Sequence, residues 1–175
     1  MIRTLNKQIF AAVCIALLAA CSAIGHNGSN GSDLRAEVKQ GQETLKTAEA
    51  FLTAAGSGDM ATLEALMTDD FVWHNEGDET LPWIGNWEGK DTVLTEFLPA
   101  FGAGLTATSW TTDYSMAIGD QAIFMGTMSA TVPSSGGQTG QFSWAVRVHV
   151  EDDKVKSWNW FEDSFAVSKA YHSAE

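Results

Sequence analysis

The residue most suggestive of proton transfer in this sequence is His74, in the segment FVWHNEG, residues 71–77. An imidazole changes its charge near neutral pH, so a histidine in a pocket can act as a general acid or base. The segment reads as a strand, and its alternation places His74 on the face opposite Trp73 and Asn75. His74 is therefore a candidate catalytic residue, and a partly exposed strand histidine is the structural alternative.

The sequence gives no sign of a metal site. No set of His, Cys, Asp and Glu has the spacing of metal ligands, and we expect no cofactor. The acidic run HNEGDE, residues 74–79, could bind a cation, but a turn of this composition is usually just solvated. The two cysteines, Cys14 and Cys21, lie at the N-terminus, so the rest of the chain offers no thiol or disulfide.

Tryptophan is frequent: the chain contains seven, all on or beside predicted strands. Aromatic side chains of this size fill protein cores. They also line the mouths of pockets that take flat or apolar ligands. Both interpretations stay open for the individual tryptophans.

The first half of the sequence predicts three helices and two short strands. Apolar residues at helical spacing predict a helix from Asp33 to the glycines at 56 and 58. Asp59 then caps a second helix in MATLEALM, residues 60–67. Strands follow in DDFVWHNEGDE (69–79) and TLPWIGNWEG (80–89), and a third helix in GKDTVLTEFLPAFGAG (89–104) is disturbed at Pro99.

The second half predicts four longer strands, at 105–116, 120–132, 140–151 and 154–163, and a short closing helix near 164–172. In FSWAVRVHV, residues 142–150, every second residue is apolar, which predicts one buried face. On the last strand Trp158 and Trp160 share a face, and the sequence leaves open whether it points inward. Helices followed by antiparallel strands indicate an α+β fold, with helices covering one face of a curved sheet.

The N-terminus has the features of an export signal. Arg3 and Lys7 precede an apolar run of about 12 residues, which is too short for a bilayer core that needs about 20. The following Leu-Ala-Ala-Cys, residues 18–21, resembles the lipobox of bacterial lipoproteins, in which the cysteine is lipidated and the chain is cut before it. We therefore expect residues 1–20 to be a signal peptide and Cys21 to carry the lipid; an ordinary secretory signal is the alternative.

This assignment predicts the compartment. Several acyl chains anchor a protein stably, so we expect an exported, lipid-anchored protein of the cell envelope. Ser22 after the cysteine favours the outer membrane over the inner one, because lipoproteins retained at the inner membrane tend to have Asp there. Residues 21–33 would be the lipidated cysteine and a flexible linker rich in Gly, Ser and Asn, and residues 34–175 the folded domain.

The acidic composition excludes some partners. The formal net charge is −12, and removal of Arg3 and Lys7 with the signal would make it more negative by two. No basic patch or run of Lys and Arg is present, so nucleic acid is not an expected partner. The membrane would be contacted through the lipid on Cys21.

Four segments resemble the nuclear transport factor 2-like superfamily, and in particular its SnoaL-like branch. They are FLTAAGSGDMATLEALMTDDFVW (51–73), PWIGNWEGKDTVLTEF (82–97), VRVHVEDDKVKSWNWFED (146–163) and EDSFAVSKAY (162–171). Each motif is weak alone, but they occur in the family's order and spacing. The resemblance implies a cone-shaped α+β domain whose sheet and helices enclose a pocket. It also implies that dimers are common, and it leaves the function open.

The resemblance also directs attention to particular positions. The catalytic base of the ketosteroid isomerases falls on Asn75, their tyrosine near Phe51 and their second acid near Val146, and none of these can do that chemistry. SnoaL-like cyclases use a late aspartate, which makes Asp163 a second candidate catalytic residue. A helix N-cap is its structural alternative. The predicted ligand-pocket residues are Trp73, Asn75, Trp83, Trp144 and Trp160.

Three functions remain as hypotheses. The first is a membrane-tethered domain that binds a small apolar or aromatic molecule without catalysis, and the second is an isomerase, cyclase or dehydratase that uses Asp163 or His74 as acid or base. The third is a dimeric interaction module of the cell envelope. We favour the first, because the catalytic set is missing and the strands are rich in tryptophan.

Overall fold

The computed structural model describes residues 31–173. Residues 1–30 and 174–175 lie outside the described residues, and with them the predicted signal peptide, Cys21 and most of the linker. The chain divides between Arg35 and Ala36 into two units. Of the first unit only Gly31–Arg35 are described, as the first residues of a helix, and the fold discussed below is that of the second unit.

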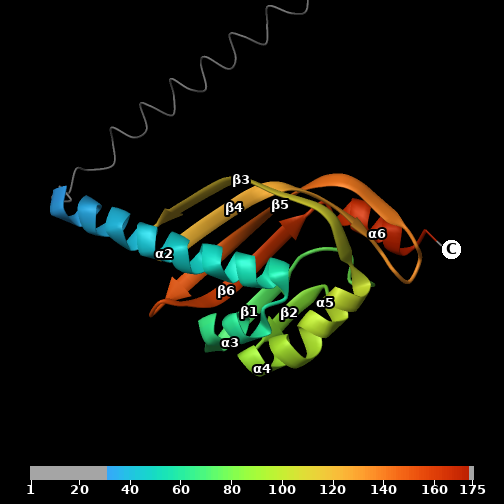
Figure 1. Ribbon diagram of the computed structural model, residues 1–175, viewed down its shortest axis with the longest axis horizontal. Helices are drawn as coiled ribbons and strands as arrows, with labels where there is room; N and C mark the ends of the chain where they lie inside the picture. The colour runs from blue at the N-terminus through green and yellow to red at the C-terminus, as the bar shows by residue number, and fades with distance from the viewer. Residues whose placement is uncertain (1–30, 174–175) are drawn as a thin grey trace, which may run out of the picture. The chain divides into compact units, whose positions relative to one another are not determined.

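The order of elements matches the α+β arrangement expected from the sequence (Figure 1). The helices are α2 (Gly31–Ser57), α3 (Met60–Leu66), α4 (Lys90–Thr92), α5 (Leu98–Gly104) and α6 (Ser164–Tyr171), and a π-helical segment, η1 (Val93–Phe97), joins α4 to α5. The strands are β1 (Met67–Asn75), β2 (Gly85–Glu88), β3 (Thr106–Ile118), β4 (Gln121–Thr131), β5 (Gln138–Glu151) and β6 (Lys154–Glu162).

The strands form one sheet in the order β2-β1-β6-β5-β4-β3. Strand β1 runs parallel to β6, and the other neighbouring pairs are antiparallel. Hairpins connect the consecutive strands β3, β4, β5 and β6, as expected for antiparallel neighbours. The parallel pair places the early strand β1 beside the last strand β6, and this brings the FVWHN and WNW segments together.

Two helix starts and one helix irregularity follow directly from the sequence. Asp59 caps α3 by accepting from the Thr62 backbone N–H at 3.1 Å, and Asp163 caps α6 by accepting from that of Ala166 at 3.2 Å. Pro99 lies in the first turn of α5, immediately after the π-helical segment. Because proline has no N–H to donate, the regular α-helical ladder cannot continue through it, so the predicted disturbance at Pro99 is confirmed.

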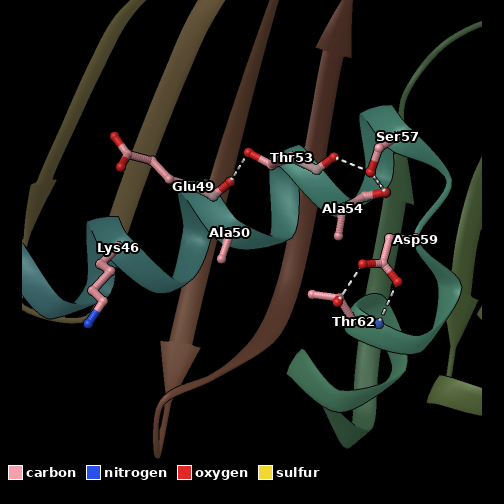
Figure 2. A pocket seen from close by; sticks show the side chains of 8 residues that line it. All are labelled: Lys46, Glu49, Ala50, Thr53, Ala54, Ser57, Asp59 and Thr62. Atoms are coloured by element: carbon pink, nitrogen blue, oxygen red, sulfur yellow. Dashed lines mark hydrogen bonds between the residues drawn. The ribbon is translucent and has the colours of Figure 1, made fainter.

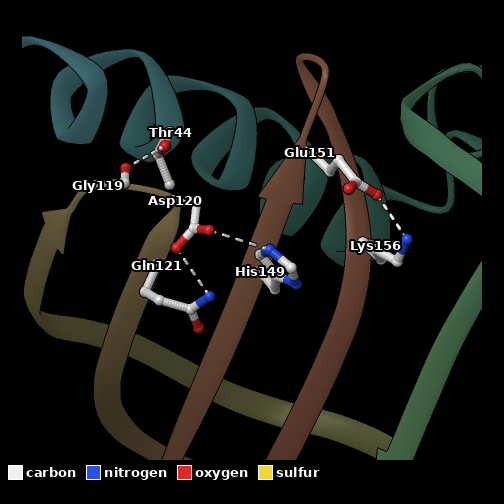
Figure 3. Close-up of polar contacts among 7 residues, drawn as sticks. All are labelled: Thr44, Gly119, Asp120, Gln121, His149, Glu151 and Lys156. Atoms are coloured by element: carbon white, nitrogen blue, oxygen red, sulfur yellow. Dashed lines mark hydrogen bonds and ion pairs between the residues drawn. The ribbon is translucent and has the colours of Figure 1, made fainter.

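Helix α2 packs closely on the turn between β3 and β4. The Thr44 hydroxyl, which is almost fully buried, donates to the Gly119 carbonyl at 2.7 Å (Figure 3). Gly41 lies so close to β3 that a Cβ atom there would come within 2.9 Å of the Ala117 carbonyl oxygen. A glycine in the middle of a helix costs stability, and here it permits this close approach.

The core lies between the helices and the inner face of the sheet. Alternate residues of β5, from Phe142 to Val150, are buried, which confirms the apolar face expected there. Helix α2 adds Phe51, whose ring centroid lies 4.9 Å from that of Trp158 and 6.2 Å from that of Trp73. In the described part of the chain, no helix is both long and apolar enough to cross a membrane.

Candidate functional site

A cavity of about 670 Å³ opens between the inner face of the sheet and the ends of the helices. Its walls come from the C-terminal end of α2, from α3 and α5, and from strands β1, β3, β4 and β6. The volume falls in the roughly 300–1,000 Å³ range typical of small-molecule sites. None of its lining residues is charged, and Asn75 and Thr106 provide the only polar side chains.

The tryptophans that line this cavity arrive there by strand alternation and register. Trp73 and Asn75 alternate on β1, and Trp158 and Trp160 alternate on β6. The parallel register pairs Trp73 with Trp158 and Asn75 with Trp160, and all four line the cavity. The face of Trp158 and Trp160, which the sequence leaves open, therefore points inward.

Asn75 is the polar centre of the cavity wall, with only 2% of its surface exposed. Its Oδ1 accepts from the Trp73 indole Nε1–H at 2.8 Å, and its Nδ2 donates to the Trp83 carbonyl at 3.2 Å. An indole N–H can only donate and a carbonyl can only accept, so these two partners fix which way the amide points. One N–H and one lone pair of the amide remain for a further partner.

A second group of tryptophans forms a stack at one wall. The ring centroids of Trp110 and Trp144 lie 4.2 Å apart, and those of Trp144 and Trp160 lie 5.2 Å apart with planes only 11° from parallel. Gly126 underlies this stack, because a Cβ there would come within 2.9 Å of the Trp144 ring. Trp110 and Trp160 line the cavity, and Trp110 remains 42% exposed.

Two of the predicted pocket residues lie elsewhere. Trp83 is fully buried and meets Phe101 and Tyr171 edge to face, so it belongs to the core behind the cavity. Trp144 is also buried, stacks against Trp110 and Trp160, and is not part of the lining. Sequence alternation identifies inward residues, but it cannot tell those facing an open space from those facing other side chains.

The two candidate catalytic residues do not line the cavity. His74 lies on the opposite face of β1, where Nδ1 is 2.5 Å from Asn86 Oδ1 and Nε2 is 3.4 Å from Glu76 Oε1. Asp163 is an exposed N-cap of α6, which is the structural alternative weighed above. Among the residues lining the cavity, none is an imidazole or a carboxylate.

One carboxyl group is hydrogen-bonded to the cavity wall, that of Glu162, which sequence reasoning missed. It shares the inward face of β6 with Trp158 and Trp160, and its Oε2 accepts from the Trp160 indole N–H at 2.9 Å. Burial raises the pKa of Glu162, and the neighbouring Asp163 charge adds to this effect. Strand phase was the available signal, since residues 158, 160 and 162 must share a face.

A second hollow, of about 410 Å³, lies on the outer side of α2 and α3 (Figure 2). Several of its polar groups form local bonds: Thr53 donates to the Glu49 carbonyl, and the Asp59 carboxylate accepts from Thr62. It is shallow and wide open, so we assign no ligand to it. In residues 31–173, no three His, Cys, Asp or Glu side chains lie close enough to hold a metal ion.

Comparison with known proteins places the chain in a family. A profile of the SnoaL-like domain matches residues 48–158, and the chain belongs to this family. No curated protein matches. One similar solved structure is an NTF2-like protein from Burkholderia xenovorans LB400, with 22% identity, a TM-score of 0.68, and coverage of 75% of this chain and 98% of that one.

Two further structures have the same fold. One is an NTF2-like protein of unknown function from Burkholderia pseudomallei K96243, with 15% identity, a TM-score of 0.65, and coverage of 74% of this chain and 98% of that one. The other is an epoxide hydrolase from M. tuberculosis, with 20% identity, a TM-score of 0.58, and coverage of 77% and 93%. Identities this low establish the NTF2-like fold and nothing more specific.

Proposed function

We propose that this SnoaL-like domain binds a small, apolar or aromatic molecule in its cavity and does not catalyse a reaction on it. The single observation that supports this most is the lining, which is mainly aromatic and apolar, includes four tryptophans, has Asn75 and Thr106 as its polar side chains and contains no charged residue. Such a surface gains free energy by covering an apolar ligand, and Asn75 can orient it through one hydrogen bond.

The enzyme alternative has less support. A general acid or base must lie within hydrogen-bond reach of the substrate, and neither His74 nor Asp163 lines the cavity. An amide such as that of Asn75 cannot take a proton at neutral pH. Substrate turnover that is abolished in both His74→Gln and Asp163→Asn would reverse this choice.

Fluorescence of N-phenyl-1-naphthylamine, a neutral apolar dye, tests the binding proposal. Ala107 lines the cavity and is exposed on the edge strand β3, so the bulk of Ala107→Trp should obstruct the cavity without disturbing the core. Ser109→Trp is the matched control, because Ser109 is exposed on the same strand and does not line the cavity. We expect saturable binding to the wild type and the control, and at least about tenfold weaker binding to Ala107→Trp. Equal binding to all three would reject this site.

We further propose that the domain is held at the membrane by lipid on Cys21. The support is the sequence alone: a basic start, a short apolar run and the Leu-Ala-Ala-Cys motif. Incorporation of a radioactive fatty acid into the wild type, and not into Cys21→Ser, is the expected result. An unlabelled wild type would contradict the proposal.

The outer face of the sheet supports a third proposal, the pairing of two copies. Tyr114, Met116, Ile123 and Met125 are all exposed there, and the register places Tyr114 opposite Met125 and Met116 opposite Ile123. A contiguous apolar patch of this kind is typical of an interaction site. Sedimentation should show a dimer that Met116→Lys with Met125→Lys converts to a monomer; a monomeric wild type would reject pairing.

A further inference from the structure

Glu162 is a half-buried carboxyl group that has no cationic partner among residues 31–173. Partial burial takes some of its surface out of water, and it accepts one hydrogen bond, from the indole of Trp160 at 2.9 Å. The described chain provides no ion pair to it, and the one charged group that acts on it is Asp163, which is also negative. Removing a carboxylate from water is costly unless a positive charge offsets the loss.

The rings beside Glu162 also favour a positive charge. Aromatic faces carry negative electrostatic potential, and tryptophan gives the strongest cation–π attraction. Trp110 and Trp160 both line the cavity, with centroids 5.8 Å apart, and the Trp160 N–H donates to Glu162. A carboxylate accepting from the indole N–H pushes electron density into that ring, which makes its face more attractive to a cation.

No charged side chain on the cavity wall would attract an anion. The lining contains no Lys, Arg or His, and the whole chain has a formal charge of −12. A field of this sign raises the local concentration of cations and lowers that of anions. The uncharged aromatic wall, the Glu162 carboxyl group bonded to it and the net charge therefore all favour a cationic ligand.

We propose that the ligand of this cavity is an organic cation, an ammonium or similarly charged nitrogen carried on an apolar or aromatic body, bound against Trp160 with Glu162 behind it. This inference rests on the binding function proposed above and names the class of its ligand. Glu162 acts on the cation across the Trp160 indole, so it is a positioning residue, and Trp160 is the residue in contact.

Two compounds of nearly the same shape test the sign of the charge. They are benzyltrimethylammonium and 2,2-dimethylpropylbenzene, in which a carbon replaces the charged nitrogen. Each is titrated as a competitor against N-phenyl-1-naphthylamine bound to the purified protein. We expect the cation to bind at least about tenfold more tightly than its neutral isostere, as a partly desolvated cation–π contact and a nearby carboxylate predict.

Two variants assign the selectivity to Glu162. Glu162→Gln keeps the shape and the acceptor for Trp160, and should lower the preference for the cation at least about fivefold while the neutral compound binds as before. Asp163→Asn is the matched control, because Asp163 is the neighbouring carboxyl group, does not line the cavity, and can be replaced by asparagine as the N-cap of α6. It should change the preference less than twofold. If the dye binds but both compounds compete equally, or if Glu162→Gln retains the preference, the cation inference is wrong and the binding function stands. If neither dye nor compound binds, both proposals fail.

Discussion

Asp78 and Glu162 are two carboxyl groups in contrasting regions of the same domain. Asp78 lies in the loop between β1 and β2, where its Oδ2 accepts from Ser168 of α6 and its Oδ1 accepts from the Thr80 hydroxyl at 2.7 Å. With the Thr80 backbone N–H and nearby His172, these donors lower the pKa of Asp78 to about 2. Glu162 accepts one bond beside the tryptophans, and burial raises its pKa.

The contrast distinguishes a structural carboxylate, whose negative charge is stabilised by several donors, from a carboxylate whose negative charge is not offset. The group around Asp78, which we call the Asp78 clamp (Asp78, Thr80, Ser168 and His172), fastens the loop to α6, and its donors satisfy the negative charge. The aromatic wall (Trp73, Trp110, Trp158 and Trp160) provides shape and one donor to Glu162, so its negative charge is left for a ligand to balance. The two regions should therefore respond in opposite ways to mutation and to pH.

Trp158→Ala should have the largest effect, because the aromatic wall is also core. Trp158 is 1% exposed and packs against Phe51 and Trp73, so its truncation should lower the free energy of unfolding by about 3–5 kcal/mol. Trp158→Phe keeps a ring in place and should cost clearly less. Urea unfolding followed by circular dichroism gives both values, and equal losses would show that the ring itself contributes little.

Asn75→Ala should have the next largest effect. The change leaves the Trp73 indole N–H and the Trp83 carbonyl without their partner, at a cost of about 2 kcal/mol in the free energy of unfolding. Asn75→Ser shortens the side chain in the same way but keeps a hydroxyl, and recovery of part of the loss is expected. If Asn75→Ala were as stable as the wild type, the two hydrogen bonds of the amide would contribute nothing to folding.

Asp78→Asn should destabilise the protein at neutral pH, more modestly, because an amide cannot accept from all the donors of the clamp. The folded pKa of about 2 lies below the ordinary value of 3.8, so this contribution is complete above about pH 4 and is lost as the pH falls through 2. Thermal unfolding of both proteins from pH 7 to pH 2 should therefore converge at the acidic end. A constant difference across that range would contradict the assignment.

Glu162→Gln should have the smallest effect and the opposite sign. Because the folded pKa of Glu162 lies above the ordinary 4.5, the ionised carboxylate disfavours the folded state. Stability then falls as the pH rises from the ordinary value through the raised one. The variant should be more stable than the wild type at neutral pH, and the gain should disappear below about pH 4.5. A loss of stability at neutral pH would show that other groups in the folded protein stabilise the ionised Glu162 carboxylate.

The sequence predicts most of the fold because local signals agree with the global one. Asp59, Asp163 and Pro99 mark helix boundaries through their own backbone chemistry, and the alternation from 142 to 150 identifies the buried face of β5. Gly41 reads as a weak point in a helix, and only the structure shows that β3 lies against it.

The cavity was less predictable, for a physical reason. The sequence predicts Trp73, Asn75 and Trp160 as pocket residues, and all three line the cavity. Trp83 and Trp144 are tryptophans that are equally buried, but they pack against other side chains instead. Trp110 belongs to an edge strand exposed along nearly its whole length, so alternation gives it no direction. An inward side chain faces an open space only where the helices packed over the sheet do not reach it. That depends on tertiary packing, which no local sequence pattern predicts.

The most direct test of the central claim is an NMR titration of the tryptophan indole N–H signals with N-phenyl-1-naphthylamine, each assigned through a single Trp→Phe variant. Binding in the cavity should shift the signals of Trp73, Trp110, Trp158 and Trp160 with one common dissociation constant, and leave that of Trp87, outside the lining, nearly unmoved. Unchanged lining signals, or shifts confined to backbone amides of the outer sheet face, would contradict the account.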